Sequence, residues 1–176
     1  DDDVCRQASR QEIIRRYYHA VDGIAAGTRL EEEAFKIELL MKQEHITVND
    51  RSTVSPALVR AEATGAPAVA MELPNGKIIT GKTSDLLGPS AALLLNAIKE
   101  LAGIDHEKHI ISPTAIEPIQ TLKIKYLGSK NPRLHTDEVL IALSTTASRS
   151  DDAKLALTQL PRLQGCQVHS SVMLSE

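Results

Sequence analysis

The chain has 176 residues, of which 42% are hydrophobic, 24% charged and only 2% aromatic, and its formal net charge is −3. A negative net charge argues against a general nucleic-acid-binding protein, and the scarcity of aromatic side chains removes the stacking platforms used to bind single strands. No apolar run approaches the ~20 residues of a membrane-spanning helix, and the N-terminal stretch is no signal peptide, so we expect a cytoplasmic protein that binds neither nucleic acid nor membrane.

The first 65 residues are predicted to be helical. Apolar side chains recur at helical spacing from residue 3 to residue 26, and Gly27 suits the end of that helix. Residues 30–44 begin acidic and end basic, which the helix dipole favours. Ser55 and Pro56 begin a short third helix that runs toward Gly65. We expect these helices to form a small N-terminal subdomain, residues 1–65.

Residues 76–83, GKIITGKT, match the Walker A pattern of a phosphate-binding loop letter for letter. That mechanism requires a strand, a flexible glycine-rich loop and a helix. Two isoleucines and a threonine between the glycines prefer an extended backbone instead, and Asn75-Gly76 between two apolar runs signals a β-hairpin. We therefore predict a hairpin with Gly76 in its turn, which leaves only Gly81-Lys82-Thr83 able to meet an anion.

The rest of the chain alternates helices with short strands. Pro89 and Gly103 bound a helix over 88–103, and HIIS at 109–112 is predicted as a strand. Pro118 is expected to interrupt the next helix, leaving one turn at 113–117 and a helix from 118 to about 126. Thr136 and Ser150 are predicted helix caps, and residues 166–174 a strand. This order implies a layered α/β sheet with at least one parallel pair of strands.

Several long stretches together resemble a known family: SRQEIIRRYYHA, ELPNGKIITGKTSDLLGPSAALLLNAIKELAGI, HIISP, IEPIQTLKIKYLGSKNPRLHTDEVLIAL, AKLALTQLP and GCQVHSSVMLSE. They closely resemble the C-terminal part of a bacterial family of large uncharacterised proteins, catalogued as a domain of unknown function. The resemblance implies that the chain is a fragment, preceded in the family by an N-terminal part with a phosphate-loop-like stretch.

The resemblance also implies a fold similar to the cytidine-deaminase core. The expected fold class is α/β: a three-layer α/β/α arrangement with an opening β-hairpin and a mixed sheet, preceded by the helical subdomain. The core would span residues 66–176 and be truncated at its C-terminal end.

Zinc-deaminase chemistry is not expected, because it needs H-x-E and P-C-x-x-C motifs and neither is present. His106 and His109 are interpreted as solvated loop residues, and Cys166 and His169 would point to opposite faces of a strand. We therefore predict no bound metal and no cofactor. Cys5 and Cys166 are expected to be free thiols in a reducing compartment.

The segment from residue 119 to residue 136 supports a functional hypothesis, the binding of an anion. Residues 119–136 contain Lys123, Lys125, Lys130 and Arg133 without an acidic residue, followed within the same loop by His135. A cluster of one charge sign attracts anions. The alternative is that Lys123 and Lys125 form a solvated helix face near a C-terminal end, where cations are favoured.

Two loops are therefore candidates for an anion site. The loop GSKNPRLH would aim Lys130, Arg133 and His135 at a ligand, and GKTSDLLGPS offers hydroxyl groups, a lysine and the start of a helix. We expect both loops at the same end of the sheet. The candidate ligand-binding residues are Lys82, Thr83, Ser84, Ser90, Lys130, Arg133 and His135, and no catalytic residue is assigned.

Two function classes follow. The favoured one is a non-catalytic C-terminal structural or assembly module of a larger bacterial protein, not an enzyme on its own, with the N-terminal part of the same protein or a homo-oligomer as partner. Its sign would be exposed apolar side chains around Tyr17, Tyr18, Phe35 and Met41. The alternative is an anion- or nucleotide-binding surface, loops 82–90 and 130–135, of an enzyme completed by the N-terminal part. Its sign would be convergence of the two loops.

Overall fold

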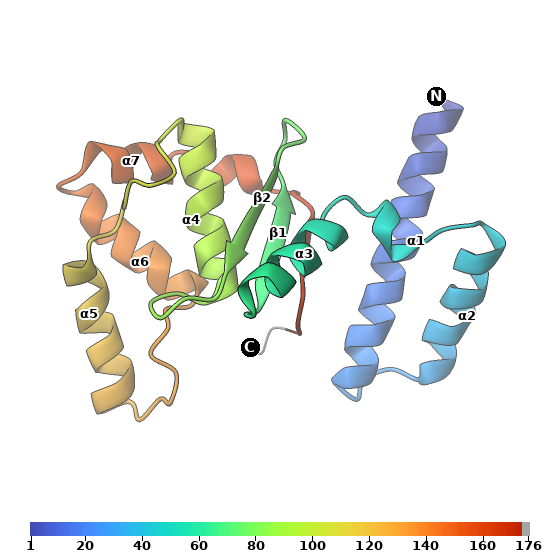
Figure 1. The fold of residues 1–176 in the computed structure, drawn as a ribbon, viewed down its shortest axis with the longest axis horizontal. Coiled ribbons are helices and arrows are strands. Elements are labelled where there is room, and N and C mark those ends of the chain that lie inside the picture. Colours follow the sequence, from blue (N-terminus) through green and yellow to red (C-terminus); the bar gives the residue numbers. More distant parts are fainter. Residues whose placement is uncertain (174–176) are drawn as a thin grey trace. The chain divides into compact units, whose positions relative to one another are not determined.

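The structure is a computed structural model that describes residues 1–173. It divides into two compact units, a helical unit of residues 1–55 and an α/β unit that begins at Pro56 (Figure 1). No helix among the described residues is both long and apolar enough to cross a membrane.

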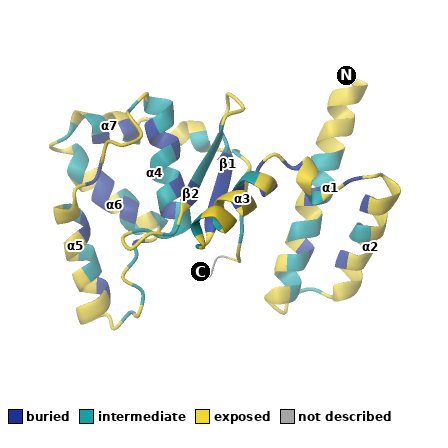
Figure 2. Cartoon of the chain, viewed as in Figure 1, coloured by how far each residue is buried: buried dark blue, intermediate teal, exposed yellow. Residues whose placement is uncertain are grey.

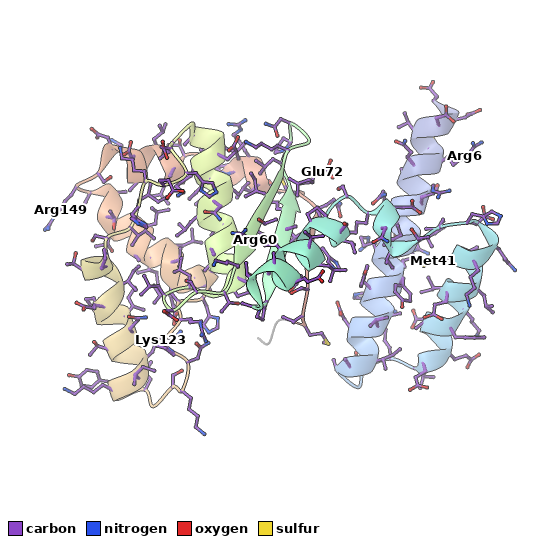
Figure 3. All side chains as sticks on the ribbon, viewed as in Figure 1. Arg6, Met41, Arg60, Glu72, Lys123 and Arg149 are labelled. Carbon is purple, nitrogen blue, oxygen red and sulfur yellow. The ribbon has the colours of Figure 1, made fainter. Side chains whose placement is uncertain are left out.

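The helical unit confirms the first two predicted helices. It contains α1 (Asp2–Ala25), α2 (Glu31–Gln43) and a 3₁₀ turn (Val48–Asp50), and Gly27 after α1 has φ +72°. Its core is small: Ile14 of α1, Met41 of α2 and Ile46 are buried together, and Figure 3 shows Met41 on α2. The third predicted helix, α3 (Val54–Thr64), ends just before Gly65 as expected and starts one residue before Ser55.

The hairpin prediction is confirmed. Strands β1 (Ala68–Glu72) and β2 (Ile78–Lys82) pair antiparallel, and Gly76 lies in the connecting turn with φ +80°. Gly81 has a packing role, because a Cβ there would lie 2.6 Å from the Pro89 carbonyl oxygen and from Leu93 Cα. The Walker-type glycines therefore serve a turn and a close approach of β2 to a helix, not a phosphate cradle.

The sheet is antiparallel, which corrects the prediction of a mixed sheet with a parallel pair. Its order is β2-β1-β3, and β3 (Val168–Ser170) pairs antiparallel with β1. The predicted strand at 166–174 is thus shortened, and residue 174 lies outside the described residues. Residues 109–112 form no strand, and Ile110 and Ile111 are instead buried in a cluster formed largely by helices. A parallel pairing does occur, as an isolated bridge between Leu87 and Leu134.

Helix α4 (Pro89–Ala102) is the centre of the α/β unit. One side packs on the sheet, where Leu93 and Ala97 meet Val69 and Met71 of β1. Another side carries Ile98 into a larger cluster formed with the helices that follow (Figure 2). The predicted bounds hold, since Pro89 is in the first turn and Gly103 ends the helix with φ +66°.

The remaining helices show one further correction. Pro118 does not interrupt a helix: α5 (Pro113–Thr121) runs through it and continues as a π-helix (Leu122–Tyr126). Proline removes one backbone donor, and a helix packed through Ile116 tolerates that loss. The chain continues with α6 (Thr136–Ala147), α7 (Asp151–Leu157) and a 3₁₀ turn (Leu160–Leu163), and Ser150 caps α7 as predicted.

Candidate functional site

The two candidate loops meet in the structure. The N–H of Leu134 donates to the carbonyl of Leu86 (2.9 Å), and the N–H of Gly88 donates to the carbonyl of Leu134 (3.0 Å). These bonds form the parallel bridge between Leu87 and Leu134. We call residues 82–90 and 129–135 together the loop junction. The sequence predicts both loops at the same end of the sheet, but it does not predict hydrogen bonds between them.

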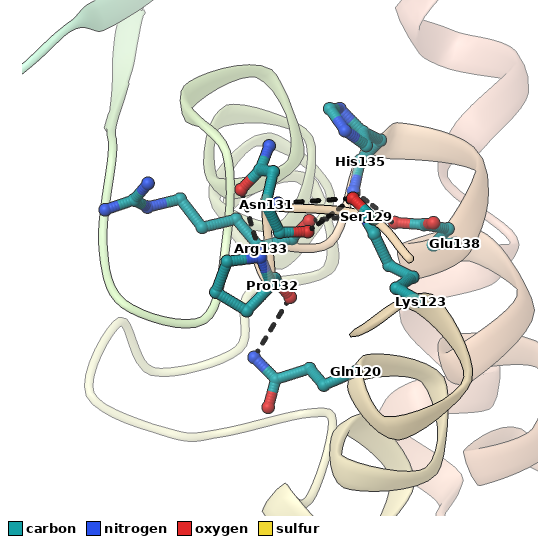
Figure 4. A network of polar contacts seen from close by, with 8 residues as sticks. All are labelled: Gln120, Lys123, Ser129, Asn131, Pro132, Arg133, His135 and Glu138. Carbon is teal, nitrogen blue, oxygen red and sulfur yellow. Dashed lines mark hydrogen bonds and ion pairs between the residues drawn. The ribbon is translucent and has the colours of Figure 1, made fainter. Parts of the chain in front are cut away.

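Arg133 ties the two loops together. Its Nε donates to the carbonyl of Ser84 (2.6 Å), and its own N–H donates to Oδ1 of Asn131 (3.1 Å). Figure 4 shows this side chain reaching from its loop toward the neighbouring one. Arg133 is only partly buried. The Nε of Arg133 therefore has a structural role in joining the loops.

A partly buried ion pair holds one loop of the junction. Lys123, whose side chain is 8% exposed, donates from Nζ to the Arg133 carbonyl (2.6 Å) and to Oε2 of Glu138 (2.7 Å). The same Glu138 oxygen accepts from the N–H of His135 (2.8 Å). Burial raises the pKa of Glu138, but the hydrogen bonds from Lys123 and His135 outweigh it, so this pKa lies below its ordinary value. The alternative of a solvated helix face is therefore wrong for Lys123 and holds for exposed Lys125.

Two helices begin at the junction. Helix α4 follows Gly88 without a side-chain cap, and α6 follows His135, which takes the N-cap position predicted for Thr136. Because Gly88 and Leu134 share a hydrogen bond, both helix starts lie within two residues of one bridge. The first N–H groups of a helix lack partners within it and carry partial positive charge. Helix α6 carries the acidic side chains of Asp137 and Glu138 in its first turn, whereas α4 carries none. The positive potential of the junction therefore comes from the N-terminus of α4, and that of α6 is offset by its own carboxylates.

The seven predicted ligand-binding residues differ in their exposure to solvent and in the hydrogen bonds they already make. Lys82, Lys130 and His135 are exposed, and Ser90 is partly buried in the first turn of α4. The hydroxyl of Thr83 donates to the Pro67 carbonyl (3.0 Å), and that of Ser84 accepts from the N–H of Leu87 (3.0 Å). Asp85 is also exposed in this loop and opposes an anion.

The described residues contain no group of three or more His, Cys, Asp or Glu side chains that could hold a metal ion. Both cysteines are unpaired: Cys5 is exposed, and Cys166 is partly buried. Burial raises the pKa of the Cys166 thiol, with a contribution from Glu72, which disfavours a reactive thiolate.

The expected apolar patch on the helical unit has a different composition. Met41 is buried, and Tyr17 and Tyr18 are partly buried, with their rings in an edge-to-face contact. Phe35 is 57% exposed as predicted. The exposed apolar side chains in and next to α2 are Leu30, Phe35, Leu39 and Leu40.

Comparison with known proteins gives the family context. Residues 49–176 match the model of a domain of unknown function, DUF1846, C-terminal, and residues 1–45 match DUF1846, N-terminal. A UPF0371 protein of Corynebacterium efficiens is 54% identical over 174 residues, which is 99% of this chain and 35% of that protein. A UPF0371 protein of Streptococcus uberis is 52% identical over 100% of this chain and 36% of its own length. The chain thus spans about a third of the length of the curated relatives it matches.

These matches correct one prediction. The chain was expected to belong wholly to a C-terminal part and to take the N-terminal part of the same protein as its partner. Residues 1–45 instead match the family's N-terminal model, and relatives align over 99% or more of the chain. The helical unit is therefore related to the N-terminal domain, and that assignment of a partner is wrong.

Proposed function

Because the chain belongs to the DUF1846 family, whose function is unknown, we propose its function from local geometry: the loop junction binds the anionic group of a ligand, a phosphate or a carboxylate. The observation that carries this proposal is the hydrogen-bonded bridge between Leu87 and Leu134, from which two helices begin. The N-terminus of α4 attracts negative charge because its first turn carries no acidic side chain, whereas Asp137 and Glu138 offset the N-terminus of α6.

The proposed roles follow from exposure and contacts. The exposed cations Lys82 and Lys130 and the exposed imidazole of His135 attract the anion, and the first N–H groups of α4, beginning at Ser90, bind it. Thr83, Ser84 and Arg133 hold the loops in place. Ser84 and Arg133 make hydrogen bonds within the junction, and Thr83 bonds to the carbonyl of Pro67, which precedes β1. No residue is assigned to catalysis, and the surface acts in recognition.

Titration with inorganic phosphate tests this proposal. Backbone amide resonances of Ser90 and Ala91 are expected to shift saturably, and binding should weaken about fivefold or more in the double variant Lys82→Gln/Lys130→Gln. The matched control is Lys125→Gln/Lys154→Gln, which removes the same charge from two exposed lysines of the same unit. Equal weakening by both double variants, or no saturable shift, would contradict the proposal.

A second candidate function is that of a non-catalytic structural or assembly module within the longer family protein. It is supported by the exposed side chains of Leu30, Phe35, Leu39 and Leu40, since clustered exposed apolar residues mark contact surfaces. Hydrogen exchange measured on this chain and on a full-length relative tests it. Residues 35–40 should exchange more slowly in the longer protein, and equal exchange would exclude a covered surface there.

We also propose a fold relationship between residues 66–173 and the cytidine-deaminase core, with a three-layer α/β/α arrangement. Support comes from the opening hairpin followed by α4, and from Ala68 and Ala70 of β1. These two residues face away from the α4 side of the sheet and are fully buried, so that face is covered as well. Residues 1–65 and 66–176 remain our proposed domain division.

A cytoplasmic location is part of the same proposal. Its support is the pair of unpaired cysteines, because a reducing compartment keeps thiols free. Labelling of both thiols in intact cells with a membrane-permeant reagent, without prior reduction, would test it.

A further inference from the structure

A second concave site lies beside strand β2, away from the loop junction. Among the described residues β2 has one sheet neighbour, β1, so its other edge is free. The N–H of Leu73 bonds to the Lys77 carbonyl and that of Thr83 to the Pro67 carbonyl, both at 2.9 Å. In an antiparallel pair such bonds alternate, so the backbone groups of Ile78 and Thr80 face the free edge.

The second half of α4 and the loop after it close this edge into a pocket. Asn96 Nδ2 donates to the Thr80 carbonyl (2.9 Å), and Lys99 Nζ donates to the carbonyls of His106 (2.5 Å) and Lys108 (3.1 Å). The pocket has a volume of about 260 Å³ and is lined by Lys77, Ile78, Ile79, Thr80, Asn96, Lys99, Glu100, Ile104 and His106.

Lys99 is the unusual group of this pocket. It is only 8% exposed, and its two hydrogen-bond partners are neutral carbonyl groups. Burial lowers the pKa of Lys99, while Glu107 and Asp105 act in the opposite direction. An ammonium group has three donors, so within the described part of the chain one donor of Lys99 has no protein acceptor. Glu100, the acidic residue among those that line the pocket, is paired with Lys77 (2.6 Å).

We propose that this pocket binds a small molecule that carries a carboxylate next to an amide. The carboxylate takes the third donor of Lys99 and the free N–H of Thr80, and the ligand's amide N–H donates to the Ile78 carbonyl. Hydrogen bonds to a charged group are shorter and stronger than those between neutral groups.

The occupant is small for two reasons. Asn96 already occupies the Thr80 carbonyl, so a longer peptide strand cannot continue its pairing along β2. The pocket volume of about 260 Å³ is also below the range of about 300–1,000 Å³ common for drug-sized ligands. The apolar side chains of Ile79, on the α4 side of β2, and of Ile104 then cover the uncharged part of the ligand.

N-acetylglycine, which has one amide and one carboxylate, is the probe. Added to the isotope-labelled chain, it should shift the backbone amides of Ile78 and Thr80 saturably. N-acetylglycinamide, which lacks the carboxylate, and the variant Lys99→Met should each bind about tenfold more weakly or worse. Equal binding of the two probes, or unchanged binding by a folded Lys99→Met chain, overturns the proposal.

A second variant keeps the test decisive if Lys99→Met fails to fold. Ile104→Trp enlarges a side chain that lines the pocket and leaves Lys99 in place. It should abolish the N-acetylglycine shifts while phosphate still shifts Ser90 and Ala91. Retained N-acetylglycine binding in this variant contradicts the proposal.

Discussion

The loop junction and the β2 pocket each contain a buried lysine, and the two lysines are compensated differently. Lys123 under the junction has a carboxylate partner, Glu138, at 2.7 Å. Lys99 in the pocket has two carbonyl partners and, among residues 1–173, no carboxylate within hydrogen-bond distance. A paired buried charge costs little as long as its partner stays, whereas an unpaired one favours the arrival of an anion. Burial alone therefore does not distinguish a structural lysine from a ligand-binding one. The distinction depends on whether the ammonium group is paired with a carboxylate.

Gly81→Ala is the change that should affect both regions most. Gly81 lies in β2 against the N-terminal part of α4, and an added Cβ would meet backbone atoms of Pro89 and Leu93, which cannot rotate away. We expect a loss of about 3 kcal/mol or more in the free energy of unfolding, measured with urea. Gly128→Ala is the control: it has φ +69° but no atom within 4 Å, and should cost only about 1 kcal/mol. Similar losses for both would mean that β2 and α4 can separate at little cost.

Lys123→Met should destabilise the junction by about 2–3 kcal/mol, because it removes a buried charge that holds the Arg133 carbonyl and Glu138. Lys125→Met, two residues away and exposed, should change stability by no more than about 0.5 kcal/mol. Glu138→Leu combined with Lys123→Met should cost less than the sum of the single changes, which urea denaturation of all four proteins measures. Additive costs would mean that the pair contributes nothing by its interaction.

Much of this architecture could be predicted from the sequence, and the exceptions have identifiable causes. Proline and glycine positions locate α4, and Asn75-Gly76 locates the hairpin, because these residues restrict the backbone locally. The bridge between Leu87 and Leu134 could not be predicted, since it joins segments 47 residues apart and depends on tertiary packing.

The same limit applies to the lysines. Lys123 was indistinguishable from the exposed Lys125 until the π-helix and the position of α6 were known. One local signal existed: Glu138 stands three residues after His135, the capping-box spacing. For Lys99, in a helix that carries three consecutive leucines, no pattern indicated which loop would cover it.

Acid should weaken the junction in a way that depends on Glu138. Its pKa in the folded protein lies below the ordinary 4.5, so its contribution to stability is present above 4.5 and is lost as the pH falls through the lowered value. The stability difference between the wild-type chain and Glu138→Gln should therefore narrow as the pH falls below 4.5. Denaturant midpoints across this range provide the measurement. A gap that stays constant into strong acid would show that the carboxylate charge does not stabilise the junction.

Lys99→Met should have a much smaller effect on stability than Lys123→Met. It removes a charge that burial disfavours but also leaves two carbonyl groups without a donor, and these two effects oppose each other. We expect a net change within about 1 kcal/mol of wild type in urea denaturation. A loss as large as that of Lys123→Met would make both lysines structural and remove the contrast between the two regions.

The last prediction is a negative one: the Walker-like segment, residues 76–83, should not bind a nucleotide. Gly76 is in a hairpin turn, residues 78–82 are paired to β1, and α4 begins only at Pro89, so the segment lacks the loop-to-helix cradle that phosphates require. Calorimetry with Mg-ATP should show no micromolar binding by the wild-type chain.

Gly76→Ala is the decisive variant because it alters the first Walker-like glycine without touching the loop junction, which contains Lys82. Micromolar Mg-ATP binding that Gly76→Ala and Lys82→Ala both abolish would return the segment to the role of a phosphate-binding loop. Weak binding lost only with Lys82→Ala would belong to the junction instead.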